Sequence, residues 1–136
     1  MKIYYAHCLA LYDTKQEKRD ILTLESLGFT VINPNTSETQ AACDRIKMWA
    51  TFANQIAHRY VDPSAEVMKY FERFAKECDA IAFRALPDGR IPGGVYTEIQ
   101  MFKKEGKPVV ELPSNILSRQ MTIEQSREYL GEVGYR

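Results

Sequence analysis

Apolar residues fall into two patterns along the chain: short runs typical of buried strands, and helically spaced stretches between them. Four runs rich in β-branched and aromatic residues predict strands over residues 2–7, 29–33, 79–83 and 107–112. Pro34 and Pro113 directly follow the second and fourth runs and end them. Strands that alternate with helices predict an α/β fold whose parallel sheet is covered on both faces and joined by right-handed crossovers.

Between these runs, apolar residues recur at the three- and four-residue spacing of one helical face. The predicted helical faces are Ile21, Leu24 and Leu27; Ile46, Trp49, Ala50, Ala53, Ile56 and Tyr60; Val67, Tyr70, Phe71 and Phe74; Val95, Ile99 and Phe102; and Ile123 and Leu130. The residues that predict helix ends are Asp13 or Thr14, Ser37 with Gln40, Thr122 with Gln125, and Gly28. We expect the aromatic residues Trp49, Tyr60 and Phe71 in the core or in a subunit interface.

Length and composition fit one globular domain over residues 1–136, because 45% of the residues are apolar and 26% are charged. Eighteen basic and 18 acidic side chains give zero net charge, which argues against a partner nucleic acid bound by phosphate neutralisation. The longest stretch of low charge, residues 3–12, is shorter than the roughly 20 residues that span a bilayer, so we expect no membrane partner. Cys8, Cys43 and Cys78 lack metal-site spacing and favour reduced thiols in a cytoplasmic protein without a bound metal.

Ligands of an open parallel sheet bind beyond the carboxyl ends of its strands, which here selects loops near residues 6–8, 33–35, 84–94 and 113–115. In the third loop, Gly93–Gly94 opens a helix, lets a ligand approach the backbone and leaves free amides that favour anions. Glu98 lies about one turn into that helix, where its carboxylate can be ionised, positioned and partly dry, as a carboxylate nucleophile must be. A surface residue that complements the helix dipole is the alternative interpretation of Glu98.

The fingerprints of common nucleotide-binding enzymes are absent from this sequence. Gly93–Gly94 is not followed by Gly-Lys-Ser/Thr, and the first strand ends in Ala6-His7-Cys8 rather than Gly-x-Gly. A classical dehydrogenase or a P-loop enzyme is therefore disfavoured.

Five short motifs occur in a characteristic order over roughly residues 2–112. They are Ile3-Tyr4-Tyr5-Ala6, Leu27-Gly28-Phe29, Cys78-Asp79-Ala80-Ile81, Gly93-Gly94 with Glu98, and Gly106-Lys107-Pro108-Val109. In this order the sequence resembles the nucleoside 2-deoxyribosyltransferase family, including its nucleoside-monophosphate N-glycosidase branch. The resemblance implies a flavodoxin-like three-layer fold with a four- or five-stranded parallel sheet between helices. It also implies a homo-oligomer that needs no cofactor and cleaves the N-glycosidic bond of a deoxynucleoside or its monophosphate, passing the sugar to another base or to water.

Carried over position by position, the resemblance makes Glu98 the nucleophile and Tyr4 the residue that orients it. Ala6 falls where the family has a small residue against which the sugar lies. In some transferases an aspartate precedes the glutamate by six residues, but here that place holds Pro92. Asp88 is the nearest acid and is our candidate for protonating the leaving base.

Other residues near the carboxyl ends of the strands are candidates for substrate binding. Asn33 and Asn35 can contact base or sugar edges, and Gly93–Gly94 can lie along the ligand. His7 stands where the family has a small residue and is either a substrate contact or a structural histidine. Arg84 can pair with a phosphate through two hydrogen bonds, and a solvated surface arginine is the alternative.

Three alternative functions stay open. Pro92-Gly93-Gly94 followed by Thr97 resembles the PGGxGT segment of the cytokinin-activating phosphoribohydrolase group, although Tyr96 and the position of Glu98 depart from it. That alternative predicts a ribonucleoside monophosphate as substrate. A non-catalytic module of the same fold would bind a nucleotide without needing Glu98, and an assembly subunit would bind no ligand.

Overall fold

The computed structural model describes residues 1–56, 60–113, 122–132 and 134. The elements in chain order are β1 (Lys2–Ala6), the 3-10 helix η1 (Leu9–Leu11), α1 (Lys15–Ser26), β2 (Thr30–Ile32), α2 (Ser37–Ile56), α3 (Pro63–Glu77), β3 (Ala80–Arg84), α4 (Gly93–Lys104), β4 (Val109–Leu112) and α6 (Ile123–Glu132). This alternation confirms the α/β prediction.

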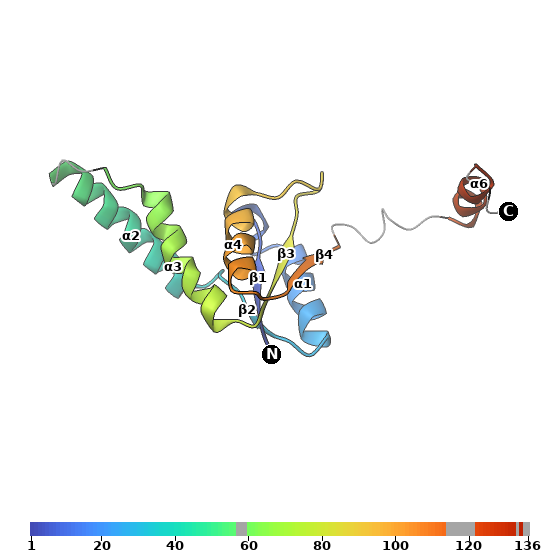
Figure 1. Cartoon of the computed structure of the whole chain (residues 1–136), viewed down its shortest axis with the longest axis horizontal. Coiled ribbons are helices and arrows are strands. Elements are labelled where there is room, and N and C mark those ends of the chain that lie inside the picture. Colours follow the sequence, from blue (N-terminus) through green and yellow to red (C-terminus); the bar gives the residue numbers. More distant parts are fainter. Residues whose placement is uncertain (57–59, 114–121, 133, 135–136) are drawn as a thin grey trace.

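The described strands form one parallel sheet in the order β2-β1-β3-β4 (Figure 1). Tyr4 in β1 lies between Ile32 of β2 and Ile81 of β3, so it occupies the middle of the sheet. The predicted parallel sheet is confirmed, with four strands in the described part of the chain. Residues 114–115 of the fourth candidate loop lie outside the described residues.

The two faces of the sheet are buried by different helices because successive side chains of a strand point to opposite sides. Ile3 and Tyr5 lie on the face that packs against Leu24 of α1. Tyr4 and Ala6 lie on the face that packs against α3 and α4. Burial on both faces explains why the strands read as nearly continuous apolar runs. The three-layer prediction is confirmed.

The helix ends follow the predicted capping residues with one exception. Thr14 caps α1 by accepting a hydrogen bond from the Glu17 amide at 3.3 Å. Thr122 and Gln125 exchange the two hydrogen bonds of a capping box before α6. The predicted cap at Ser37 is wrong, because the hydroxyl of Thr36, one residue earlier, accepts from the Thr39 amide at 3.1 Å.

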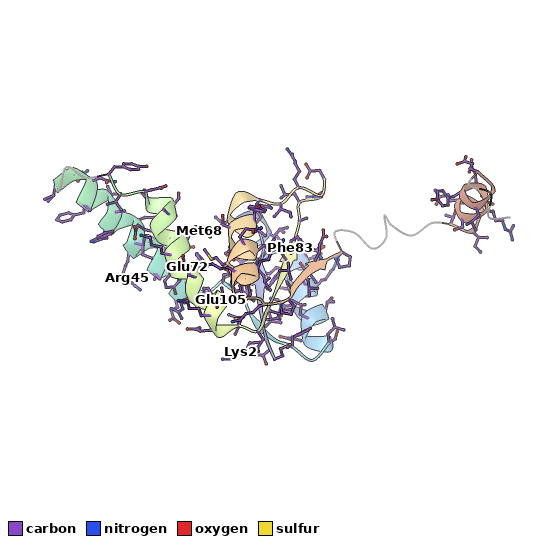
Figure 2. The ribbon with its side chains drawn as sticks, in the orientation of Figure 1. Lys2, Arg45, Met68, Glu72, Phe83 and Glu105 are labelled. Atoms are coloured by element: carbon purple, nitrogen blue, oxygen red, sulfur yellow. The ribbon has the colours of Figure 1, made fainter. Side chains whose placement is uncertain are left out.

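The helices α2 and α3 pack on each other and form an arm that extends away from the sheet (Figure 1); we call residues 37–77 the α2–α3 arm. Only α3 of the pair packs on α4. Figure 2 shows side chains filling the space between the sheet and α4, whereas those of α2 project outward along the arm. Beyond residues 114–121, α6 is drawn apart from the sheet and buries none of its residues (Figure 1). Within the described ranges, no helix has both the length and the apolar character needed to cross a membrane.

Candidate functional site

Tyr4 and Glu98 meet on the face of the sheet that α3 and α4 cover. Tyr4 is 1% exposed, and its ring stacks between Phe74 at 5.0 Å and Phe102 at 5.9 Å. Glu98 follows Val95 by three residues and precedes Phe102 by four, so it shares the helix face that these two buried side chains press onto the sheet. The period of α4 thus directs a carboxylate inward, toward the central strand.

Two buried side-chain atoms in the described part of the chain have no hydrogen-bond partner, and both belong to this pair. They are the hydroxyl oxygen of Tyr4 and Oε2 of Glu98. A buried polar atom left without a partner costs roughly 1–3 kcal/mol, so folded proteins rarely retain one without a reason. Tyr4 and Glu98 lie near enough to affect each other's pKa, which keeps this pair a candidate for ligand contact.

Burial also sets the protonation of the two groups. It raises the pKa of Glu98 to about 7, an effect that the neighbouring Tyr4 hydroxyl partly offsets. The Tyr4 hydroxyl therefore acts on the ionised carboxyl, although the two groups do not meet the geometry of a normal hydrogen bond. Burial, and next the Glu98 charge, raise the pKa of Tyr4 well above its ordinary value, so its hydroxyl stays a proton donor. A carboxyl with a pKa near 7 can exchange protons and change charge at physiological pH.

Tyr12 lies beside this pair and was not predicted from the sequence as a site residue. Its half-buried ring packs on the His7 ring at 4.7 Å between centroids. Burial and the nearby Glu98 carboxyl raise the pKa of Tyr12 above its ordinary value. The available signal was an aromatic residue in the loop directly after the first strand, where a parallel sheet binds its ligands.

The start of α4 offers an open backbone next to Glu98. Pro92 precedes the helix and gives no side-chain cap. Gly93 and Gly94 are exposed, and a Cβ added to either would meet no atom within 4 Å. Neither has a positive φ, so neither packing nor backbone conformation requires glycine there. The close approach of a ligand to the free amides stays a prediction for these two glycines.

Replacing Gly94 by alanine is therefore expected to weaken substrate binding without harming the fold. Alanine should raise the free energy of unfolding by about 0.5 kcal/mol, because it loses less backbone entropy than glycine. The KM for the substrate of the reaction proposed below should rise. Gly28→Ala is the matched control: its Cβ also has open space, but φ is +91°, so that variant should be less stable. Melting temperatures and KM values of both variants check the prediction, and an unchanged KM in Gly94→Ala would contradict it.

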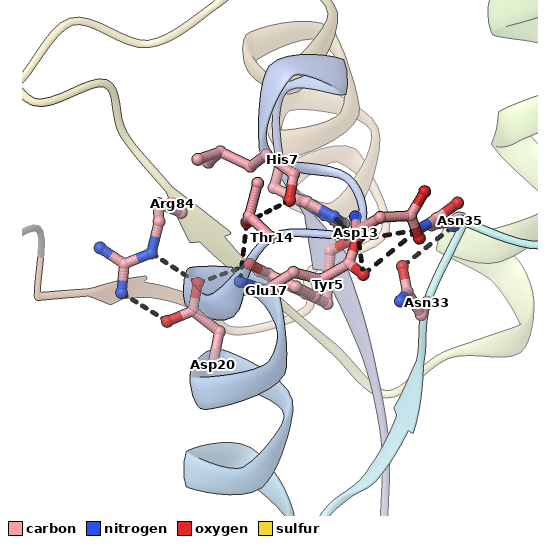
Figure 3. A network of polar contacts seen from close by, with 10 residues as sticks. Tyr5, His7, Asp13, Thr14, Glu17, Asp20, Asn33, Asn35 and Arg84 are labelled. Carbon is pink, nitrogen blue, oxygen red and sulfur yellow. Dashed lines mark hydrogen bonds and ion pairs between the residues drawn. The ribbon is translucent and has the colours of Figure 1, made fainter.

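His7 and Asn35 belong to a buried hydrogen-bond network on the α1 side of the sheet (Figure 3). His7 Nε2 lies 2.7 Å from Glu17 Oε2, and its Nδ1 lies 3.2 Å from the Tyr5 carbonyl oxygen. The side-chain nitrogen Nδ2 of Asn35 donates to Asp13 at 3.0 Å and to both carboxylate oxygens of Glu17. These bonds tie the loops after β1 and β2 to the start of α1. The side chain of His7 is fully buried, which fits the structural alternative.

Asn33 has a local role in the loop after β2. Its side-chain oxygen accepts a hydrogen bond from the backbone nitrogen of Asn35 at 2.9 Å (Figure 3). This bond fixes the turn that passes over the carboxyl edge of the sheet.

Arg84 is held inside the molecule rather than presented to a ligand (Figure 3). Its Nε and Nη2 donate to the two oxygens of Asp20 at 2.5 and 2.6 Å, and its Nη1 donates to the Pro113 carbonyl at 2.8 Å. The Tyr5 hydroxyl donates to the same Asp20 carboxylate at 2.5 Å. Arg84 and Asp20 are both buried, so a phosphate would have to displace a paired carboxylate to reach the guanidinium.

Asp88 stands at an exposed turn in the loop between β3 and α4. Its carboxylate accepts hydrogen bonds from the Arg90 guanidinium at 2.6 Å and from the Arg90 amide at 3.0 Å. The same turn is closed by backbone bonds between Leu86 and Gly89 and between Leu86 and Arg90. Within the described part of the chain, the hydrogen bonds of Asp88 are thus local, and none reaches Glu98 or Tyr4.

No three histidine, cysteine, aspartate or glutamate side chains of the described ranges gather as a metal site requires. The sequence matches no protein-family model and no curated protein. Among solved structures, the chain is similar to that of the Clostridium botulinum CMP N-glycosidase BcmB, with 18% sequence identity and a TM-score of 0.45 over the full length of both chains.

Proposed function

We propose that this protein cleaves the N-glycosidic bond of a deoxynucleoside or deoxynucleoside monophosphate and transfers the deoxyribosyl group to another base or to water. The observation that carries the proposal is the pair formed by the buried Tyr4 and the partly buried Glu98, each with a buried polar atom that lacks a partner. The resemblance of five short motifs to the nucleoside 2-deoxyribosyltransferase family, which implies a nucleophile at Glu98 and an orienting tyrosine at Tyr4, also supports it.

The chemistry follows from the bond that is broken. As the C1′–N bond breaks, its electron pair leaves with the base, which takes up a proton, and C1′ gains oxocarbenium character. The Glu98 carboxylate attacks C1′ and forms a glycosyl-enzyme. A second base or a water molecule then attacks C1′ and loses a proton to solvent, which balances the proton that the leaving base takes up from solvent, and Glu98 leaves as a carboxylate. Glu98 must be ionised to attack, and its pKa of about 7 makes both charge states accessible near neutral pH.

The other site residues receive roles from their positions. The Tyr4 hydroxyl orients and stabilises the ionised carboxyl of Glu98. Gly93 and Gly94 leave room for the sugar and, in a monophosphate, for an anion at the free amides of α4, whereas Ala6 is fully buried beneath this edge of the sheet. Tyr12 packs on His7 and lies near enough to Glu98 for that carboxyl, after burial, to raise the pKa of Tyr12. Asp88 and Arg84 take no part in the proposed reaction. The Asp88 carboxylate is paired with Arg90, and the Arg84 guanidinium is paired with Asp20.

A chromatographic turnover screen tests this function. The protein is incubated with the deoxynucleosides, their monophosphates and the matching ribonucleotides, each with and without a free acceptor base. Base release from deoxyribosyl substrates is the expected result, and exchange of bases identifies transfer. Release only from ribonucleoside monophosphates would favour the phosphoribohydrolase alternative. Absence of turnover with every compound would overturn the proposal, and thermal shifts with the same compounds would then test the binding-module alternative.

Tyr4→Phe is expected to move the pH dependence of the reaction. The phenylalanine ring keeps the stacking with Phe74 and Phe102 but removes the hydroxyl that lowers the pKa of Glu98. The pKa of Glu98 should rise above about 7, so the rising limb of kcat/KM should move to higher pH. Activity should fall at neutral pH and partly recover in alkaline buffer. The kcat/KM profile of the variant measures this shift.

Tyr5→Phe provides the control for this experiment. Tyr5 is the neighbouring tyrosine of β1, but its hydroxyl bonds to Asp20 on the opposite face of the sheet. Its removal should leave the pH of the rising limb unchanged. A limb that moves equally in both variants, or in neither, would contradict the assignment of Tyr4.

A further inference from the structure

One buried carboxylate in the first turn of α1 joins two loops at the carboxyl edge of the sheet (Figure 3). Glu17 stands three residues after the cap Thr14, where the glutamate of a capping box bonds to the amide of the cap. Here its Oε2 lies 2.7 Å from His7 Nε2, and its Oε1 accepts from the Asp13 amide at 3.3 Å. Nδ2 of Asn35 donates to both oxygens. A residue in the position of a local cap therefore ties the loop after β1 to the loop after β2.

The loop after β1 is held in a conformation that needs such support. Asp13 has a φ of +62°, the only positive φ of a non-glycine residue in the described part of the chain. Side chains disfavour this left-handed region, although aspartate tolerates it better than most residues. The Glu17 bond to its amide and the Asn35 bond to its carboxylate, at 3.0 Å, hold Asp13 there. Backbone strain that surrounding groups maintain is typical of segments that serve a functional site.

The same carboxylate fixes a group of stacked rings. The His7 ring lies 3.9 Å from the Tyr5 ring between centroids, with an angle of 4° between the two planes. The Tyr12 ring packs on the same histidine at 4.7 Å. The bond from His7 to Glu17 sets the rotation of the imidazole ring, so the place of the Tyr12 ring depends on Glu17.

Tyr12 connects this network to the proposed nucleophile. The loop that carries Tyr12 follows Ala6, which packs in one core cluster with Val95, the residue three positions before Glu98 on α4. Burial, then the Glu98 carboxyl and then the Glu17 carboxyl raise the pKa of Tyr12 above its ordinary value. The Tyr12 hydroxyl is therefore within electrostatic reach of both carboxyls.

We propose that Glu17 and His7 are positioning residues that hold Tyr12 and the loop after β1 beside Glu98. This role rests on the proposed function, because Glu98 is the nucleophile of that reaction. The side chains of His7 and Glu17 are 0 and 7% exposed, so they act through Tyr12 rather than by touching the substrate. A displacement of about 1 Å near the reacting atoms can slow a reaction on the order of 10²-fold, so the loss of this support should appear in the rate.

Glu17→Ala is expected to lower kcat/KM about 100-fold. Glu17→Gln should recover most of this loss, because its side-chain oxygen can accept from the Asp13 amide while its nitrogen donates to Nε2 of His7. Glu25→Gln is the matched control, since Glu25 also lies in α1 but is exposed. It should leave kcat/KM unchanged. Far-ultraviolet circular dichroism and thermal melts verify that each variant is folded at the assay temperature.

A double-mutant cycle separates positioning from a general weakening of the fold. Tyr12→Leu alone should lower kcat/KM, and adding Glu17→Ala to it should lower kcat/KM less than about threefold further, because Glu17 acts through the missing ring. A loss that comes only from a weakened fold would multiply in the double variant. Should Glu17→Ala not fold, His7→Phe takes its place in the cycle, since it keeps a ring against Tyr12 but removes the bond to Glu17.

Three outcomes in a chain that does turn over substrate would overturn this inference alone. They are a full effect of Glu17→Ala in the Tyr12→Leu background, an unchanged kcat/KM in Tyr12→Leu, and a Glu17→Gln variant as slow as Glu17→Ala. A wild-type chain that turns over none of the compounds in the chromatographic screen would instead overturn the proposed function, and the positioning role with it.

Discussion

Glu98→Gln is expected to remove base release and, at the same time, to stabilise the protein above neutral pH. Glutamine cannot form the glycosyl-enzyme, so kcat should fall by on the order of 10³-fold or more. The effect on stability has a separate origin. Burial raises the pKa of Glu98 to about 7, so the folded protein holds this proton more tightly than the unfolded chain does.

The sign of the stability change follows from that difference in pKa. The stabilisation from the bound proton is fully present below the ordinary carboxyl pKa and is lost as the pH rises through about 7. The glutamine side chain of the variant does not ionise, so the variant does not lose this stabilisation as the pH rises. The advantage of the variant in free energy of unfolding should therefore grow by about 2 kcal/mol between about pH 5.5 and about pH 8.5.

Urea unfolding at these two pH values measures the stability change, and the turnover assay measures the loss of activity. Glu105→Gln is a suitable control, because Glu105 is the exposed residue that ends α4 and no ligand is proposed there. It should change neither quantity. Retained turnover in Glu98→Gln would place the nucleophile elsewhere, and a pH-independent stability difference would show that the carboxylate is not held in a dry site.

Arg84→Met is expected to lower stability strongly, by about 3–5 kcal/mol, because it leaves the buried Asp20 carboxylate without its cation. In the wild-type protein, Asp20 raises the pKa of Arg84 although burial acts against the charged form. For a chain of this length, the loss corresponds to a fall in melting temperature of roughly 10–15 °C. The double variant with Asp20→Leu removes both charges and should recover most of the stability.

Thermal melts of the single and double variants check this expectation. Arg90→Met is the matched control, since Arg90 also pairs with an aspartate, but at an exposed turn where ion pairs contribute little. The same experiment decides between two roles for Arg84. A variant that keeps its melting temperature but loses affinity for nucleoside monophosphates would restore the phosphate-binding role predicted from the sequence.

The fold was predictable from the sequence because short-range patterns determine most of it. Short apolar runs rich in β-branched and aromatic residues, two of them ended by prolines, identified the strands, and the alternation with helices identified a parallel sheet. The period of α4 also predicted the inward direction of Glu98, because Val95, Ile99 and Phe102 mark the buried side of that helix. These inferences need only the local chain and the rule that ligands bind at the carboxyl ends of strands.

What the sequence did not predict depends on contacts between distant segments. Helical spacing placed Leu27, Trp49 and Ile56 on inward faces, but all three are more than half exposed, since periodicity does not say how far a covering element extends. Arg84 finds its partner Asp20 at a distance of 64 residues along the chain, which no local pattern reveals. Only the pairing of Asp88 with Arg90, two residues away, was within reach of sequence reasoning.

Because Tyr4 and Tyr5 are neighbours in β1, the register of this strand decides which of the two hydroxyls faces Glu98. Tyr4 faces Glu98, whereas Tyr5 faces Asp20. Sliding β1 by one position would send each hydroxyl to the opposite side of the sheet, so that Tyr5 rather than Tyr4 would be on the side of Glu98. Asp79 opposes such a slip: its side chain accepts from the Lys2 amide at 2.8 Å, and its own amide donates to the Lys2 carbonyl at 2.8 Å. Asp79, at the amino ends of the strands, thus helps to fix which tyrosine faces Glu98.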